Sequence, residues 1–369
     1  MRITTNSSQF YENLEVVEKA LPVRTTVPLI NNIYMQIKED KLIFSATNLE
    51  MTINTWMESK NDETGDILLP AKIIDIMRYF PTPEVNIDVN WDNFRIDVSG
   101  GSAHFLLYGA DPQDYPSTSF IEINENESYF AERGILKNMI RQVIFAASAE
   151  ETRPAFNGVL FNFSDEKLAL TASDTYRLAI KETNHSDWSF EEQKCLVPAR
   201  VLRELLRLLD DSEEKVWFNM DSRSIAFNCG EMYFASRLLE EKYPDVSGVI
   251  PTSYETRIMI DRKTFEDTIS RAALLAQGKN QAVNLVSADS NLETKVASQL
   301  GSMEESIPVE QNGEDIDLFV NSRFVLDVLR IIEEDKVIID FHGNGGPIIF
   351  RMENDPGYLY LVLPIKKFN

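Results

Sequence analysis

The sequence predicts an α+β fold of three tandem copies of one domain, each combining helices with antiparallel sheet. One phrase occurs three times: LPAKIIDIMRYF from Leu69, VPARVLRELLRLL from Val197 and FVNSRFVLDVLRII from Phe319. Each copy joins the end of an apolar strand to a short amphipathic helix with Lys or Arg on its polar side. The copies are 128 residues apart from Leu69 to Val197 and 123 apart from Val197 to Val320. A period of this length is typical of a whole domain and too long for a solenoid repeat.

Three further segments share an alanine followed by a turn and an alternating apolar strand: FSATNLEMTI (44–53), LTASDTYRLAI (170–180) and LVSADSNLETKV (285–296). They recur in the same order as the first phrase, so each domain is expected to repeat the same sequence of elements. A Tyr-Pro pair closes each of the first two copies, at Tyr115-Pro116 and Tyr243-Pro244. We therefore expect three domains, at residues 1–125, 126–252 and 253–369.

Each domain is expected to contain two helices. Apolar residues at helical spacing predict them at 7–21, 70–80, 131–149, 198–209, 261–277 and 321–332. Pro70 and Pro198 are expected in the first turn of their helices, where a missing N–H costs nothing. Asn321 is expected to cap the last helix, because its side chain can accept a hydrogen bond from a free backbone N–H.

The rest of each domain is predicted to be antiparallel sheet, because the hairpins are short and no crossover pattern for parallel strands is visible. Alternating residues at 85–100 and 215–230 predict hairpins that turn at Asp92-Asn93 and Asp221-Ser222. The glycine-rich segment 343–346 resembles a phosphate loop in composition. It lies between two apolar strands, which favours a hairpin turn.

Composition and motifs argue against a catalytic protein. The chain has 43% hydrophobic residues and a net charge of −23. It shows no signal peptide or membrane-length apolar run, so we expect a cytoplasmic protein.

Cys195 and Cys229 are expected to be free buried thiols. Metal-ligand spacings, Walker A loops and nucleophile–base pairs are missing from the sequence, so we expect no enzyme activity, no metal and no cofactor. A metal-dependent nuclease using clustered acids such as Asp210-Asp211, or an acidic adaptor for basic proteins, remains an alternative.

The predicted helices are mildly basic, although the strands and loops carry a large excess of acid. Arg200, Arg203 and Arg207 follow i, i+3, i+7 spacing and so share one helical face. Lys137 and Arg141 form a second pair at i, i+4 spacing. These faces are typical of ordinary solvated helices. They also suit a surface that holds a phosphate backbone weakly and without reading its sequence.

Several of these phrases resemble those of the bacterial DNA polymerase III beta subunit family, the replicative sliding clamps, in order and over essentially the whole chain. The phrases are ETRPAFNGVLF (151–161), TASDTYRLAI (171–180), VPARVLRELLR (197–207), YPDV (243–246), VNSRFVLDVL (320–329) and YLYLVLPI (358–365). The resemblance implies a head-to-tail homodimer that closes into a ring of six domains, with helices lining the hole and sheets outside. Such a ring encircles double-stranded DNA without sequence preference and tethers the polymerase for processive synthesis. It also implies that Arg24, Lys72, Arg200 and Arg203 face the DNA.

The resemblance further implies two protein-binding surfaces. The dimer interface would join Phe105 and Leu107 of one protomer to Leu274 and Leu275 of the other. A pocket between the second and third domains would bind short peptide motifs of the polymerase alpha subunit, the clamp loader and repair proteins. Its wall would contain Phe156, Ser173, Thr175, Tyr176, Arg177, Leu178, Pro244, Val249, Asn321, Phe324, Leu361, Val362, Leu363, Pro364 and Ile365.

The sequence departs from the family pattern around this pocket. Thr175-Tyr176 replaces a glycine followed by histidine or tyrosine, which is expected to narrow the rim. Gly248 and Asn280 stand where some members have an arginine and an aromatic residue. The chain continues through Lys366–Asn369, past the usual end. The peptide preference is therefore not predicted.

Overall fold

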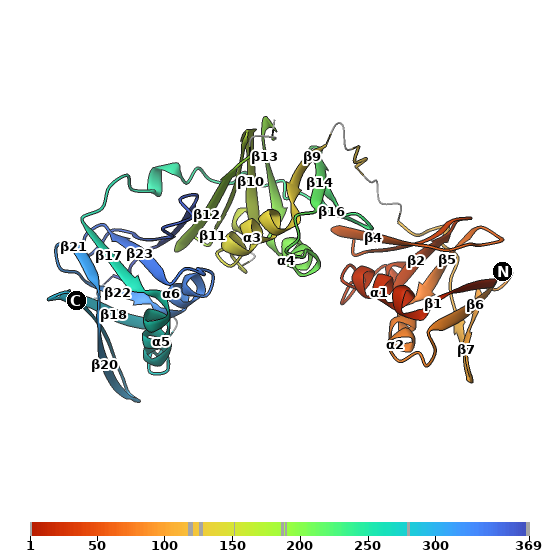
Figure 1. The fold of residues 1–369 in the computed structure, drawn as a ribbon, viewed down its shortest axis with the longest axis horizontal. Helices are drawn as coiled ribbons and strands as arrows, with labels where there is room; N and C mark the ends of the chain where they lie inside the picture. The colour runs from red at the N-terminus through yellow and green to blue at the C-terminus, as the bar shows by residue number, and fades with distance from the viewer. Residues whose placement is uncertain are drawn as a thin grey trace. The chain divides into compact units, whose positions relative to one another are not determined.

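A computed structural model describes residues 2–116, 121–124, 128–150, 152–185, 188, 190–278 and 281–366 (Figure 1). Asn280 and residues 367–369 therefore lie outside the described residues. The chain forms two compact units. The first contains Met1–Leu136 and Val201–Leu238, and the second contains Lys137–Arg200 and Leu239–Asn369.

The first unit contains an eight-stranded sheet in the order β5-β2-β3-β4-β16-β15-β14-β9 and a four-stranded sheet in the order β1-β6-β7-β8. Its strands are β1 Arg2–Asn6, β2 Asn32–Ile37, β3 Lys41–Thr47, β4 Met51–Glu58, β5 Gly65–Pro70, β6 Glu84–Asn90, β7 Arg95–Gly100, β8 Ala103–Tyr108, β9 Tyr129–Glu132, β14 Lys215–Met220, β15 Ser224–Asn228 and β16 Met232–Arg237. The large sheet is continuous from the first repeat into the second, because β4 pairs with β16 from Met51↔Ser236 to Thr55↔Met232.

The second unit contains a nine-stranded sheet in the order β13-β10-β11-β12-β25-β24-β23-β17-β21 and a four-stranded sheet in the order β20-β19-β18-β22. Its strands are β10 Gly158–Asp165, β11 Lys167–Ser173, β12 Arg177–Asn184, β13 Phe190–Pro198, β17 Thr256–Asp261, β18 Ala282–Ala288, β19 Asn291–Ser298, β20 Gly301–Pro308, β21 Glu310–Gly313, β22 Asp317–Asn321, β23 Lys336–Phe341, β24 Ile348–Arg351 and β25 Tyr358–Val362. Here β12 pairs with β25, from Arg177↔Val362 to Lys181↔Tyr358. Strands of the second repeat thus continue a sheet of each neighbouring repeat.

Every named strand pair is antiparallel, and the hairpins form where the sequence predicts them. Asn90 pairs with Arg95 across the Asp92-Asn93 turn, and Met220 pairs with Ile225 across the next. The glycine-rich segment connects β23 to β24, with Phe341 paired to Ile348. It is therefore a hairpin connection, as predicted.

The six predicted helices are present, each within its predicted range: α1 Ser7–Glu18, α2 Lys72–Arg78, α3 Arg133–Ile144, α4 Ala199–Leu208, α5 Arg262–Ala273 and α6 Ser322–Leu329. Asn321 caps α6, because its side-chain oxygen accepts a hydrogen bond from the backbone N–H of Arg323 at 3.0 Å. The prediction that two prolines lie in the first turn of their helices is wrong, because Pro70 lies two residues before α2 and Pro198 lies one residue before α4. Pro70 and Pro198 end β5 and β13, where they pair with Asn32 and Gly158.

The helices pack on the sheets through apolar faces. Phe10 of α1 meets Phe44 of β3 edge-on, with 5.0 Å between ring centroids, and α5 and α6 lie side by side in the second unit (Figure 1). The nine-stranded sheet contains the fully buried rings of Phe341, Tyr358 and Tyr360. None of the helices in the described part of the chain is long and apolar enough to cross a membrane.

Candidate functional site

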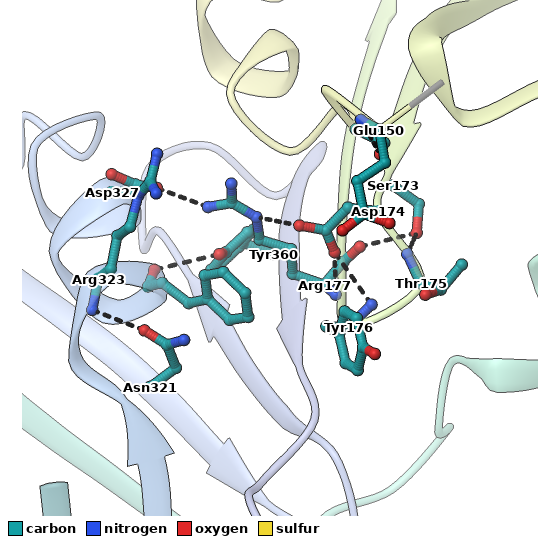
Figure 2. Close-up of polar contacts among 12 residues, drawn as sticks. Glu150, Ser173, Asp174, Thr175, Tyr176, Arg177, Asn321, Arg323, Asp327 and Tyr360 are labelled. Carbon is teal, nitrogen blue, oxygen red and sulfur yellow. Dashed lines mark hydrogen bonds and ion pairs between the residues drawn. The ribbon is translucent and has the colours of Figure 1, made fainter. Parts of the chain in front are cut away.

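The turn between β11 and β12 is fixed by its own side chains. The Asp174 carboxylate accepts hydrogen bonds from the backbone N–H groups of Tyr176 and Arg177, both at 3.0 Å. The Ser173 hydroxyl accepts from the Thr175 N–H at 3.1 Å and donates to the Arg177 carbonyl at 2.7 Å (Figure 2). Thr175 adopts φ of 78°, a left-handed conformation that favours glycine. The turn leaves Tyr176 63% exposed.

Arg177 lies behind this turn and is almost fully enclosed, with 7% of its side chain exposed. Its guanidinium donates to Asp174 at 2.9 Å and to Asp327 at 2.6 Å (Figure 2). The guanidinium carbon also lies 4.5 Å from the Phe324 ring centroid. Burial acts to lower the pKa of Arg177, but Tyr360 and the two carboxylates outweigh it and raise the pKa. The charge of Arg177 is therefore used inside the protein, where it joins the turn to α6.

The segment from Leu361 to Ile365 runs alongside the same turn. The Leu363 N–H donates to the Tyr176 carbonyl at 2.9 Å, and the Ile365 N–H donates to the Phe319 carbonyl at 2.7 Å. The side chains of Leu361 and Val362 are buried, whereas Leu363 is 44% exposed. The first two residues therefore belong to the sheet, and the exposed surface begins at Leu363.

The loop before β17 and the short helix before β10 border the turn. The Arg153 guanidinium donates to the Thr175 hydroxyl at 2.9 Å. Three residues on, Phe156 meets Tyr243 edge-on, with ring centroids 5.6 Å apart. Pro244 is exposed, and Val249 in the short helix Ser247–Val249 is 56% exposed.

The residues predicted to form the peptide pocket thus divide into two groups within the second unit. The buried group forms the support: Ser173, Arg177, Leu178, Leu361 and Val362. The exposed or half-buried group remains available to a partner: Phe156, Thr175, Tyr176, Pro244, Val249, Asn321, Phe324, Leu363, Pro364 and Ile365. Tyr176, Val249 and Leu363 are the large apolar side chains of this surface that are most exposed.

The residues that hold Arg177 in place were not predicted from the sequence. Asp174 could have been found, because an aspartate after an apolar strand is a common turn residue. Asp327 lies 150 residues from Arg177 in the chain, and no local pattern connects them. Tyr360 reads as a core strand residue, yet its hydroxyl donates to the Phe324 carbonyl at 3.1 Å.

The basic face of α4 is exposed, as its spacing indicates. Arg200, Arg203 and Arg207 are exposed, while Leu202, Leu205 and Leu209 are buried: the two sets occupy different sides of the helix. Arg207 also donates to the Glu204 carboxylate at 2.8 Å. A surface pair of this kind contributes little and does not prevent contact with another anion.

The other predicted DNA-facing residues differ in their surroundings. Arg24 is exposed in the loop after α1, and Lys72 at the start of α2 donates to Asp75 at 2.8 Å. Lys137 is half-buried on α3. Arg141 donates to Glu333 at 2.6 Å with 32% of its side chain exposed. Arg141 is therefore partly neutralised within the second unit.

Two exposed apolar segments suit self-association. β8 is an edge strand of its sheet, and Phe105 and Tyr108 on it are 36% and 71% exposed, while Leu107 is half-buried. Leu274 after α5 is 78% exposed and Leu275 is half-buried. An open strand edge with apolar side chains is a surface that proteins normally cover.

The acidic pair considered for metal catalysis has another role. Asp210 accepts hydrogen bonds from the Ser212 hydroxyl at 2.6 Å and from Arg133 at 2.9 Å, and these contacts hold its pKa below the usual range. Within the described residues, no group of three or more His, Cys, Asp or Glu side chains is arranged to hold a metal ion. Asp210 therefore stabilises a loop through hydrogen bonds.

Comparison with known proteins gives one consistent result. Family models of the DNA polymerase III beta subunit match in three consecutive parts: the N-terminal domain at residues 1–119, the central domain at 132–245 and the C-terminal domain at 247–366. A beta sliding clamp of Staphylococcus epidermidis is 31% identical over 100% of both chains. The DNA polymerase sliding clamp of Bacillus subtilis is 29% identical, with a TM-score of 0.94 over 100% of both chains. The sliding clamp of Bartonella birtlesii, solved bound to griselimycin, is 26% identical with a TM-score of 0.93 over 100% of both chains.

Proposed function

Because the chain belongs to the DNA polymerase III beta subunit family, it is a beta sliding clamp, and we propose that it acts by encircling duplex DNA and tethering the replicative polymerase. The observation that carries this proposal is the match in sequence and fold over the full length of its relatives. A clamp of this family is a processivity factor and not a catalytic subunit. Its location is proposed to be the cytoplasm, where bacterial replication takes place.

The DNA contacts are proposed to come from basic residues of the helices and of the loop after α1. Five of them are exposed, namely Arg24, Lys72, Arg200, Arg203 and Arg207, and two are half-buried, namely Lys137 and Arg141. Support comes from the exposed arginine face of α4 on a chain with net charge −23. Phosphate contacts position a protein without reading bases. A few weak contacts of this type would let the ring move along the duplex and would weaken as salt is added.

The surface around Tyr176 is proposed to bind peptide motifs of the polymerase alpha subunit, the clamp loader and other replication proteins. Support comes from three exposed apolar side chains, Tyr176, Val249 and Leu363, on a rigid support built around Arg177. Apolar anchors flanked by a few fixed polar groups are what a short peptide needs for affinity and register. The Thr175 conformation keeps the turn tight although a threonine replaces the glycine common in this family.

A closed ring requires a homodimer, and we propose that β8 of one protomer meets the third domain of its partner near Leu274. Support comes from the exposed apolar residues on both segments. The domain limits are proposed to be 1–125, 126–252 and 253–369. The limit at 252/253 falls between the short helix Ser247–Val249 and β17, and the limit at 125/126 lies outside the described residues. The sheets themselves continue from repeat to repeat.

Solution mass tests the dimer. Light scattering at micromolar protein should give twice the chain mass of 42.2 kDa, and Leu274→Glu should reduce it to one chain mass. Leu300→Glu, a change at another exposed leucine of the same unit, is the matched control and should leave the dimer intact. A native protein that stays monomeric would refute the ring, because one chain contributes only three of the six domains.

A further inference from the structure

One face of the nine-stranded sheet carries a charged cluster that the clamp function does not use. Arg257 of β17 pairs across the sheet with Asp340 of β23, and Asp340 pairs in turn with Ile349 of β24. Arg351 lies two residues after Ile349, so its side chain leaves β24 on the same face. Three adjacent strands thus bring two arginines together around one aspartate.

The aspartate is enclosed and fully engaged. Only 4% of the Asp340 side chain is exposed. Its carboxylate accepts from Arg257 Nε at 2.6 Å and Nη2 at 2.9 Å, and from Arg351 Nε at 3.1 Å. One arginine is enough to neutralise one carboxylate, so the cluster keeps one positive charge.

Donor groups of both arginines remain available. The Asp340 bonds use one Nη group of Arg257 and neither Nη group of Arg351, and among the described residues no other acceptor is bonded to the remaining groups. About a third of each side chain is exposed, 36% for Arg257 and 32% for Arg351. The Tyr254 ring lies 4.1 Å from the Arg257 guanidinium carbon and holds that group in place.

The cluster opens into a cavity of about 380 Å³, the size of a small-ligand site. Its lining is Pro251, Thr252, Ser253, Tyr254, Arg257, Asp340, His342 and Arg351. Asp340 is the only acidic residue in that lining, and hydroxyl groups of Thr252 and Ser253 add possible donors. The cavity is therefore locally cationic on a strongly acidic protein.

We propose that this cavity binds an oxyanion, either a phosphate group or a carboxylate, through the free donors of Arg257 and Arg351. Guanidinium groups bind such planar or tetrahedral anions through two parallel hydrogen bonds. The buried aspartate holds both arginines in position before the ligand arrives, so little side-chain entropy is lost on binding. This site shares no residue with the surface around Tyr176 and needs no DNA.

Calorimetric titration of the full-length protein with inorganic phosphate, at constant ionic strength balanced with chloride, tests the site. We expect a dissociation constant of about 1 mM or tighter, and Arg351→Gln should weaken binding about tenfold or more, because it removes a charge-assisted contact. Arg330→Gln removes an exposed charge from the end of α6 and should change nothing. The proposal would be overturned if the native protein bound neither phosphate nor acetate. It would also be overturned if Arg351→Gln bound phosphate as tightly as the native protein does.

A second titration with acetate distinguishes a phosphate ligand from a carboxylate ligand. Tighter binding of phosphate indicates a phosphate ligand, and binding of acetate at equal or higher affinity indicates a carboxylate, such as an acidic side chain of a partner. Arg351→Lys keeps the charge and loses the two-pronged geometry, so it should bind more tightly than Arg351→Gln. If Arg351→Lys and Arg351→Gln lose the same amount of phosphate affinity, with unchanged thermal stability, the role assigned to the positive charge is contradicted.

Discussion

Replacing Tyr176 with serine is expected to weaken binding of a polymerase-derived peptide without destabilising the protein. Tyr176 is 63% exposed, so a peptide that covers it would bury roughly 120 Å² of additional surface, given about 200 Å² for a whole aromatic side chain. At about 25 cal/mol per Å² this is worth about 3 kcal/mol, or roughly a hundredfold in affinity. Leu363 is 44% exposed. Complete burial of a leucine side chain is worth about 1.5–3 kcal/mol, so covering the exposed part gives about 1 kcal/mol, or roughly fivefold in affinity.

Fluorescence anisotropy with a labelled C-terminal peptide of the cognate polymerase measures these losses, and thermal unfolding measures stability. Arg177→Ala is the instructive comparison. It leaves the carboxylates of Asp174 and Asp327, 16% and 22% exposed, without their partner. Breaking an enclosed pair costs about 3–5 kcal/mol, so this variant should also unfold roughly 10 °C lower. Unchanged peptide affinity in Tyr176→Ser, with unchanged thermal stability, would refute the assignment of this surface.

Three other measurements address separate parts of the molecule. Burial raises the pKa of the Cys195 and Cys229 thiols to about 12, so neither should react with a thiol reagent at pH 8 until the protein is unfolded; rapid labelling of native protein would contradict their burial. Asp261→Ala removes the α5 cap and should lower the free energy of unfolding by about 1 kcal/mol at pH 7. Hydrogen bonds from the first helical turn lower the Asp261 pKa. The difference in free energy of unfolding between the native protein and Asp261→Ala should therefore be complete above about pH 4 and shrink as the pH falls further. A difference that stays constant down to about pH 2 would be inconsistent with that cause. Arg203→Glu should reduce loading onto circular DNA and the salt dependence of that loading, whereas Arg223→Glu at an exposed hairpin should not; equal effects of the two variants would indicate a general charge effect.

The helices and the strand alternation were predictable because their signals are local. The α4 periodicity alone separates exposed Arg203 from buried Leu202 and Leu205. The family resemblance also selected Tyr176 and Leu363, which a backbone hydrogen bond joins, and their role in peptide binding stays a prediction. The end of a strand is less predictable. Pairing with Gly158 extends β13 through Pro198, so α4 begins at Ala199, one residue later than predicted.

The supporting contacts could not be read from local pattern. Arg177 was expected in the wall of the peptide pocket, but nothing near it in the sequence indicates that Asp327 and Phe324, far along the chain, enclose it. The continuation of sheets through β4–β16 and β12–β25 is equally long-range. A domain-length repeat identifies similar units, and it does not encode which strand edges of those units join.

Retention on DNA circles tests the sliding-clamp account most directly. The protein, loaded by its cognate clamp loader and ATP onto nicked circular plasmid, should remain bound through gel filtration at a salt concentration that removes free protein. Cutting the plasmid once with a restriction enzyme should release it, because a ring slides off a free end, while a mock digest should not. Equal retention on circular and linear DNA would contradict topological binding, as would a failure to remain on circles.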